Sequence, residues 1–104
     1  MALPPLWFIT GASSGLGYHL SLHALTAGHR VVATIRNVSK SGSAVNRITS
    51  AGGKVMELDM ADADAIAKVA KEAESTYGPP SVLVNNAGYS VLGAVEDLTL
   101  VGKY

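Results

Sequence analysis

Short apolar runs alternate with amphipathic stretches along this chain. The apolar runs are rich in β-branched or aromatic residues and end at glycine or polar residues, a pattern typical of strands buried on both faces. We expect four strands, at residues 6–9, 31–35, 55–58 and 82–84. The stretches between them carry apolar residues at helical spacing. We expect three helices, at residues 15–27, 38–51 and 62–77.

The first predicted helix has one face of apolar residues that we expect to pack on the sheet. That face is formed by Leu16, Leu20, Ala24 and Ala27, and Gly28 is expected to cap the end of the helix. In the second helix, the corresponding inward positions are Val45 and Ile48.

The third helix has the clearest pattern of the chain. Asp62 and Asp64 stand at its start, where negative charge complements the helix dipole. Its apolar residues recur at positions that share one face. The expected inner face consists of Ile66, Val69, Ala70, Ala73 and Tyr77.

The resulting order of elements is a strict alternation of strand and helix. Such alternation requires parallel strands joined by right-handed crossovers, because a helix returns the chain to the same end of the sheet. The sequence therefore predicts an α/β fold with a doubly wound parallel sheet.

Composition narrows the possible functions. The 104 residues are enough for a single domain, spanning 1–104, and 48% are hydrophobic against 15% charged. Eight basic residues balance eight acidic ones, which argues against nucleic-acid or membrane-surface binding, and there is no cysteine for a disulfide or thiolate site. The first nine residues lack the basic start of a signal peptide, so we expect a cytoplasmic protein.

The strongest motif is the glycine-rich stretch from Thr10 to Gly17, with the spacing Gly-x3-Gly-x-Gly. It leaves a predicted strand and opens a predicted helix, the context in which such a loop binds a dinucleotide. Gly11 permits a tight turn, Gly15 lets the backbone approach a pyrophosphate, and Gly17 lets the helix pack on the strand. The alternative is a glycine-rich turn without a ligand. The predicted binding residues are Gly11, Ser13, Ser14, Gly15, Leu16 and Gly17, the two serines as hydroxyl donors.

Two further motifs accompany this loop. Asn85-Asn86-Ala87-Gly88 follows the fourth strand, and Leu58-Asp59-Met60 ends the third. With the glycine loop, these motifs make residues 6–99 resemble the short-chain dehydrogenase/reductase family. The resemblance implies a Rossmann-type sheet with strand order 3-2-1-4, a nicotinamide dinucleotide cofactor, and hydride transfer between that cofactor and a carbonyl or alcohol substrate.

The resemblance also assigns roles to residues after strands three and four. It implies that the Asp59 carboxylate accepts a hydrogen bond from the adenine amino group, assisted by the backbone N–H of Met60. The alternative for Asp59 is a cap of the following helix. Asn86, Ala87 and Gly88 would border the adenosine ribose, whereas Asn85 more simply ties strand four to its neighbour.

The end of the second strand bears on the choice of cofactor. Enzymes that prefer NAD place an acid there, but this chain has Ile35 followed by Arg36. A guanidinium is planar and permanently charged and suits the 2′-phosphate of NADP, with Lys40 as a possible assistant. Ser14 stands where many NADP-preferring relatives carry a second basic residue. We predict NADP over NAD, the alternative for Arg36 being a solvated loop cation.

The family's catalytic serine and its Tyr-x3-Lys pair have no counterpart in this chain. No lysine stands four positions after a tyrosine. At that distance the first three tyrosines are followed by Leu22, Ser81 and Gly93, and Tyr104 is the last residue. We therefore expect the N-terminal part of a family member, without catalytic residues and with weak cofactor binding alone. A binding module without turnover and a non-functional fragment remain alternatives, and the substrate and oligomer contacts would lie beyond residue 104.

Two other features of the sequence are better explained by a structural role than by metal or ligand binding. His19 and His23 lie four apart on the first predicted helix, but no third ligand is evident, so we expect surface histidines and no metal. Trp7 in the first strand is expected to be a core residue.

Overall fold

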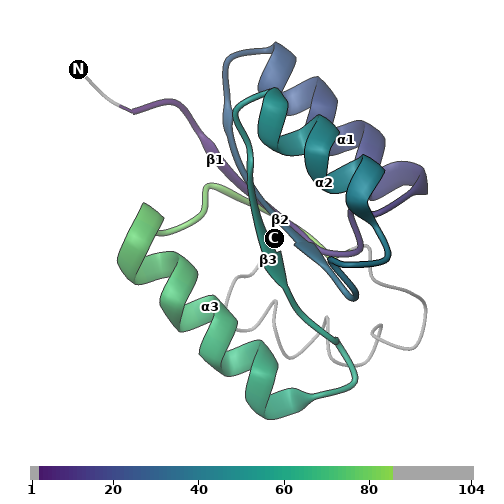
Figure 1. Cartoon of the computed structure of the whole chain (residues 1–104). Coiled ribbons are helices and arrows are strands. Elements are labelled where there is room, and N and C mark those ends of the chain that lie inside the picture. The colour runs from purple at the N-terminus through teal and green to yellow at the C-terminus, as the bar shows by residue number, and fades with distance from the viewer. Residues whose placement is uncertain (1–2, 86–104) are drawn as a thin grey trace.

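A computed structural model of the chain describes residues 3–85, in which strands and helices alternate in the predicted order (Figure 1). The strands are β1 (Leu6–Ile9), β2 (Arg30–Ile35), β3 (Lys54–Glu57) and β4 (Val82–Val84). The helices are α1 (Gly15–Thr26), α2 (Gly42–Ser50) and α3 (Ala63–Tyr77). None of these helices is long and apolar enough to span a bilayer.

The strands form one parallel sheet in the order β3-β2-β1-β4. This confirms the α/β class, the doubly wound parallel sheet and the order 3-2-1-4. Phe8 of β1 pairs with Val32 of β2 on one side and with Leu83 of β4 on the other. Because all strands run the same way, their carboxyl ends meet at one edge of the sheet.

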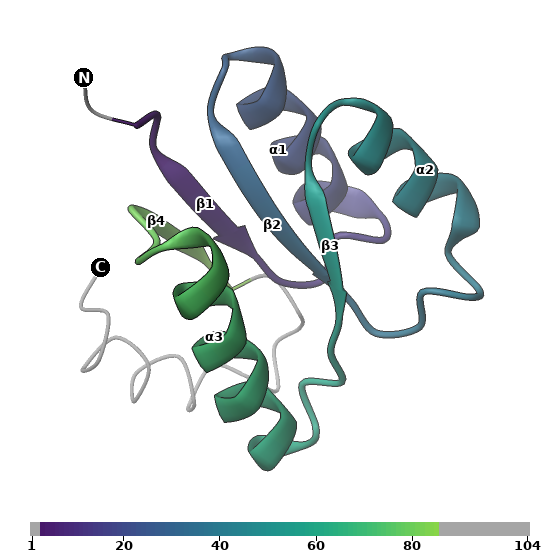
Figure 2. The same cartoon turned by 60° about the vertical axis from the view of Figure 1, so that its left-hand side comes forward.

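Helices cover both faces of the sheet. Figures 1 and 2 show α1 and α2 side by side on one face and α3 on the other. Successive residues of β1 and β2 therefore point into two different apolar layers, which explains why both strands are apolar at nearly every position. The layer under α1 and α2 includes Ile9, Val31, Ala33, Ile35 and Ile48. The layer under α3 includes Leu6, Phe8, Val32 and Ala73.

Helix α1 packs on the sheet through a face that matches the predicted one only in part: Ala24 is buried and Leu20 packs against the core, but Leu16 and Ala27 are exposed. Its buried residues are Gly17, Ser21 and Ala24, whereas Leu16 is 63% exposed. Small residues let the helix approach the strands closely, and the Ser21 hydroxyl is satisfied by donating to the Gly17 carbonyl at 2.7 Å. The large apolar residue at the start of the helix consequently faces solvent.

The end of α1 also differs slightly from the prediction. Ala27, predicted to face the sheet, is exposed and is the C-cap residue. Gly28 follows it with a φ of 86°, in the left-handed region that glycine adopts without strain.

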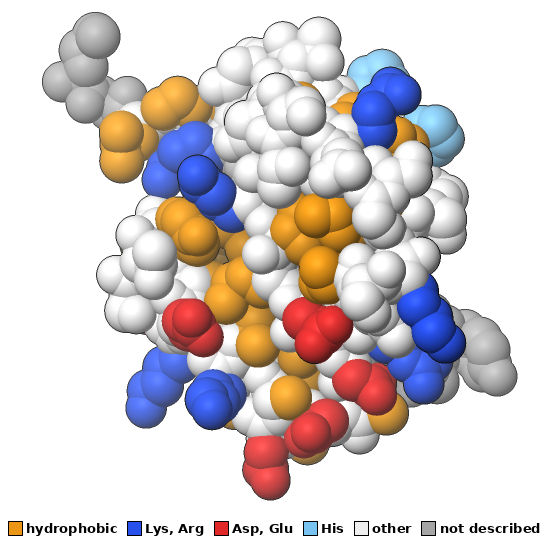
Figure 3. Space-filling model, in the orientation of Figure 1, with side chains coloured by type: hydrophobic (Ala, Val, Ile, Leu, Met, Phe, Trp, Pro, Cys, Tyr) orange, Lys and Arg blue, Asp and Glu red, His pale blue; other side chains and the backbone are white. Residues whose placement is uncertain are grey.

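Helix α3 covers its face of the sheet only in part. Ala73 is buried, as predicted, but Ala70 is exposed. A groove of about 600 Å³ lies between the helix and the strands, lined mainly by apolar side chains of β1, β4 and α3. Figure 3 shows apolar side chains at the surface along this side of the sheet.

Side-chain hydrogen bonds join neighbouring segments at the amino-terminal edge of the sheet. Trp7 is partly buried against the layer under α1 and α2, and its indole N–H donates to His29 Nδ1 at 2.9 Å. Arg30 donates from Nε to the Pro4 carbonyl at 3.1 Å and from an Nη to the Tyr77 carbonyl at 3.0 Å. This guanidinium joins the chain before β1 to the end of α3, so it has a structural role.

Candidate nucleotide-binding site

The glycine-rich loop lies over the centre of the sheet, at its carboxyl edge. The N–H of Thr10 donates to the Val84 carbonyl at 3.0 Å, and the N–H of Ala12 donates to the Thr34 carbonyl at 3.0 Å. The loop is thus tied to β4 on one side and β2 on the other. Gly11 has a φ of 65° and Gly15 a φ of 61°, so both adopt the left-handed conformation that favours glycine.

Helix α1 begins without a cap from its own N-cap side chain. Its N-cap residue, Ser14, makes no side-chain capping hydrogen bond, and no acidic residue lies in the first turn. The first N–H groups of a helix have no acceptor within the helix, and the dipole leaves partial positive charge there. Ser13, Ser14, Gly15 and Leu16 are exposed around this end. The arrangement suits an anion such as a pyrophosphate.

Helix α3 provides the contrast within the same chain. Its N-cap residue, Asp62, accepts a hydrogen bond from the Ala65 N–H at 3.0 Å, and Asp64 adds negative charge to the first turn. One of the free N–H groups at this helix end is thus bonded by the protein itself, and the two carboxylates would repel an anion there.

This contrast predicts different costs for removing the two N-cap side chains. Asp62→Ala should lower the free energy of unfolding by about 1 kcal/mol, the usual effect of losing a cap. Ser14→Ala should lower it by much less, because no capping hydrogen bond is lost. Urea denaturation of both variants beside the wild type measures the difference, and equal losses would show that Ser14 does cap α1.

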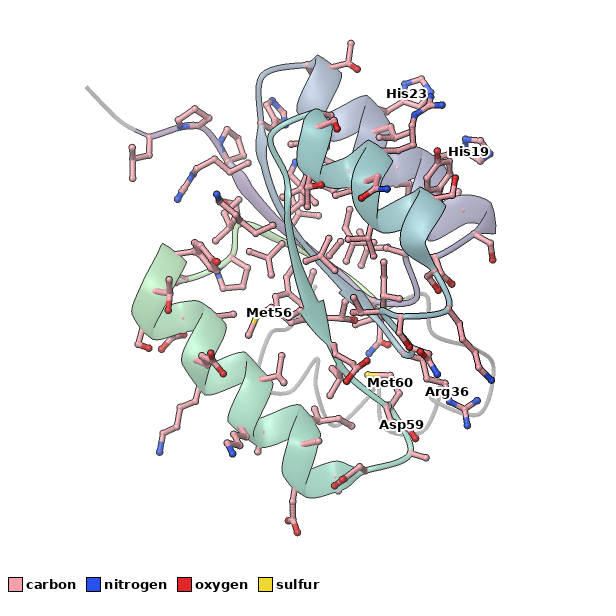
Figure 4. The ribbon with its side chains drawn as sticks, in the orientation of Figure 1. His19, His23, Arg36, Met56, Asp59 and Met60 are labelled. Atoms are coloured by element: carbon pink, nitrogen blue, oxygen red, sulfur yellow. The ribbon has the colours of Figure 1, made fainter. Side chains whose placement is uncertain are left out.

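Arg36, Asp59 and Met60 lie together at the carboxyl edge of the sheet (Figure 4). Arg36 follows β2 and Asp59 follows the adjacent strand β3, so the pairing of these strands brings the two side chains together. Arg36 Nε lies 3.9 Å from Asp59 Oδ2, and the side chains are 82% and 48% exposed. A pair this exposed contributes little to stability. It places the guanidinium beside the Asp59 carboxylate, with Nε the nearest nitrogen.

Asp59 does not cap the following helix, so that alternative reading of the residue is wrong. Its Oδ1 accepts from the Ala61 N–H at 2.9 Å, and its carbonyl accepts from the Asp62 N–H at 3.0 Å. These bonds form a turn that places Asp62 at the cap position. Asp59 Oδ2 remains exposed beside Arg36 and accessible to a ligand.

The glycine loop lies where the direction of winding changes, and the Arg36–Asp59 pair lies on the same edge of the sheet, at the ends of β2 and β3. From β1 the chain moves through α1 to β2 and β3, and α3 then returns it across the opposite face to β4, beside β1 (Figure 2). The connections on either side of β1 therefore diverge at the carboxyl ends of the strands. Ligands of open α/β sheets bind at this position.

Asn85 links strand β4 to its neighbour, as predicted. The Thr10 hydroxyl donates to Asn85 Oδ1 at 3.4 Å, joining the residues that follow β1 and β4. Both residues also line the end of the groove beside α3, together with Met60. The predicted ribose-bordering residues Asn86, Ala87 and Gly88 lie outside the described residues.

The loop between β2 and α2 contains two contacts that the sequence analysis did not anticipate. Glu57 Oε2 accepts from the Val38 N–H at 3.0 Å, and Asn37 Oδ1 accepts from the Lys40 N–H at 3.1 Å. The Asn37 contact holds this segment in a turn, which is why α2 starts at Gly42 and not at residue 38. Asparagine after a buried strand was an available signal for that turn, whereas nothing local indicated the role of Glu57.

Comparison with known proteins identifies the family. The family model described as short chain dehydrogenase matches residues 6–101. The chain belongs to this family. Members of the family bind a nicotinamide dinucleotide and a substrate. Among curated relatives, the oxidoreductase claN of Passalora fulva is 45% identical over 102 residues, an alignment that covers 94% of this chain and 44% of the relative.

Solved structures of the short-chain dehydrogenase family share the fold. A short-chain dehydrogenase from Streptomyces avermitilis matches with a TM-score of 0.74 and 35% identity, covering 82% of this chain and 31% of that protein. A metagenomic short-chain oxidoreductase in complex with NADP matches with a TM-score of 0.70 and 37% identity, covering 83% of this chain and 40% of that protein. The chain thus spans less than half the length of these relatives.

The two histidines of α1 lie away from this site. His19 and His23 are exposed on the outer side of the helix (Figure 4), as predicted for surface residues. Across residues 3–85, no group of three histidine, cysteine, aspartate or glutamate side chains is arranged to hold a metal ion.

Proposed function

We propose that this chain binds NADP(H), with the pyrophosphate at the N-terminus of α1 and the adenosine half beside Arg36 and Asp59. The observation that carries the proposal is the start of α1, where the N-cap residue Ser14 makes no side-chain cap and Gly11 and Gly15 adopt the left-handed conformation. Backbone N–H groups at such a helix end bind a diphosphate with charge-assisted hydrogen bonds.

The residues present fit the rest of the cofactor's adenosine half. Arg36 stands at the end of β2, about where the ribose of a dinucleotide meets the second strand of such a sheet. Its exposed guanidinium has donors to offer to a 2′-phosphate, while Asp59 Oδ2 is an acceptor suited to the adenine amino group. Ile35, buried at the end of β2, cannot accept hydrogen bonds from ribose hydroxyls, which is why NADP is favoured over NAD.

For the whole protein we propose the oxidation or reduction of an alcohol or carbonyl substrate. The nicotinamide group, when bound, supplies or accepts the hydride. The part proposed for this stretch of chain is to bind and orient the adenosine and diphosphate groups, because no Tyr-x3-Lys pair occurs within the 104 residues.

Two-dimensional NMR with NADPH and NADH tests the proposed site on this chain. Addition of NADPH should shift the amide signals of Gly11, Gly15, Leu16 and Arg36, and the shifts should be half complete only at NADPH concentrations above the micromolar range. NADH should bind more weakly. Shifts confined to the groove beside α3, or none at millimolar cofactor, would contradict the proposal.

A further inference from the structure

Resting on the proposed function, a second inference concerns how Arg36 is held in place. The segment involved is residues 36–41, here called the β2–α2 loop, which leaves the sheet after Ile35 and carries Arg36 and Lys40. Side chains on a loop bind a phosphate well only if the loop is already held near its bound position, because ordering it on binding costs affinity.

The contacts of Asn37 shape this loop but do not attach it to the sheet. Asn37 Oδ1 accepts from the Ser39 hydroxyl at 2.8 Å and from the Lys40 N–H at 3.1 Å. The Ser41 N–H donates to the Val38 carbonyl at 3.2 Å. All of these bonds join residues of the loop to one another, so they define its turn and leave its placement open.

The Val38 side chain packs against the layer under α1 and α2, and the hydrogen bond that attaches the loop backbone to the sheet comes from Glu57. Its Oε2 accepts from the Val38 N–H at 3.0 Å, and Glu57 is the register partner of Ile35, the last residue of β2. Within residues 3–85, it is the one hydrogen bond recorded between the loop backbone and a side chain of another strand. Asp59, two residues further along, faces the Arg36 guanidinium at 3.9 Å.

We propose that Glu57 is a positioning residue for cofactor selection: by holding the Val38 N–H, it sets the β2–α2 loop so that Arg36 meets the 2′-phosphate. Glu57 does not touch the phosphate in this account. Its negative charge taken alone would oppose phosphate binding, so its benefit comes from the hydrogen bond and not from electrostatic attraction. This separates the proposal from a simple charge effect.

Adenosine 2′,5′-bisphosphate and ADP, titrated into the 104-residue chain by calorimetry, form the test. Both contain adenosine 5′-phosphate, and they differ in whether the second phosphate is on the 2′-oxygen or on the 5′-phosphate. The affinity for the bisphosphate divided by the affinity for ADP therefore reports on the loop. Glu57→Ala should lower this ratio about fivefold, the effect of one hydrogen bond. Glu57→Gln keeps an oxygen acceptor for the Val38 N–H and should restore the ratio. Glu72→Ala, an exposed acid on α3, is the matched charge control.

Hydrogen exchange at the Val38 amide gives an independent reading. The amide should be protected in the wild type and in Glu57→Gln, and should lose protection in Glu57→Ala. A wild-type ratio in Glu57→Ala would overturn the positioning role and leave NADP binding intact. A higher ratio in both Glu57 variants would also overturn it, because it would show a charge effect. Failure of the wild type to bind either ligand would overturn the proposed function itself.

Discussion

Replacing Arg36 with aspartate is expected to reverse the preference between the two cofactors. Affinity for NADPH should fall about 100-fold, because charge-assisted hydrogen bonds to the 2′-phosphate are lost and a like charge replaces them. Affinity for NADH should hold or rise, since a carboxylate at the end of β2 can accept hydrogen bonds from the ribose hydroxyls. Fluorescence titration with both cofactors measures the change.

A second arginine of the same chain serves as the control for Arg36→Asp. Arg47 is exposed on α2, so Arg47→Asp changes the net charge by the same amount without altering the β2–α2 loop. It should leave the ratio of NADPH to NADH affinity unchanged. If the two variants shift the ratio equally, the preference arises from overall charge, and Arg36 is the solvated cation of the alternative interpretation.

Gly15→Ala is expected to abolish most of the cofactor affinity while lowering stability only through backbone strain. A Cβ at Gly15 would meet no protein atom within 4 Å, so the change creates no clash within the chain. The φ of 61° makes an L side chain unfavourable by about 1–2 kcal/mol. The added methyl group would stand where the pyrophosphate approaches the backbone, and loss of even one charge-assisted hydrogen bond lowers affinity about tenfold or more.

Gly28→Ala isolates the backbone strain from the ligand effect. Gly28 also has a left-handed φ, 86°, and a Cβ there would likewise have open space, but it lies at the opposite end of α1. Both variants should lose similar amounts of unfolding free energy in urea, and only Gly15→Ala should lose NADPH binding. Equal NADPH affinity of the two variants would show that the phosphate does not bind at the glycine loop.

The sequence predicted the elements of this fold well because their signals are local. Apolar runs of the right length predicted β1 and β2, and the helical spacing with Asp62 and Asp64 predicted α3 and the negative charge at its start. The weaker predictions were those in which several local patterns compete. Residues 38–41 fit a helix, but the hydrogen bonds of Asn37 hold them in a turn.

The inner face of α1 shows where periodicity misleads. Of the predicted apolar stripe, Ala24 is buried, but Leu16 and Ala27 are exposed, because close packing also brings the small residues Gly17 and Ser21 against the strands. A hydrophobicity pattern counts apolar side chains and carries no information about how near a helix backbone can come to a sheet.

By itself, then, the sequence determined the alternation of strands and helices, the parallel sheet that this alternation requires, and the glycine loop at the start of α1. These depend on residues within a few positions of one another. The tertiary structure decided which distant side chains meet: Asp59 beside Arg36, and Glu57 on the amide of Val38. These contacts exist only because β2 and β3 pair in one register, and neither strand's own pattern encodes its partner's alignment.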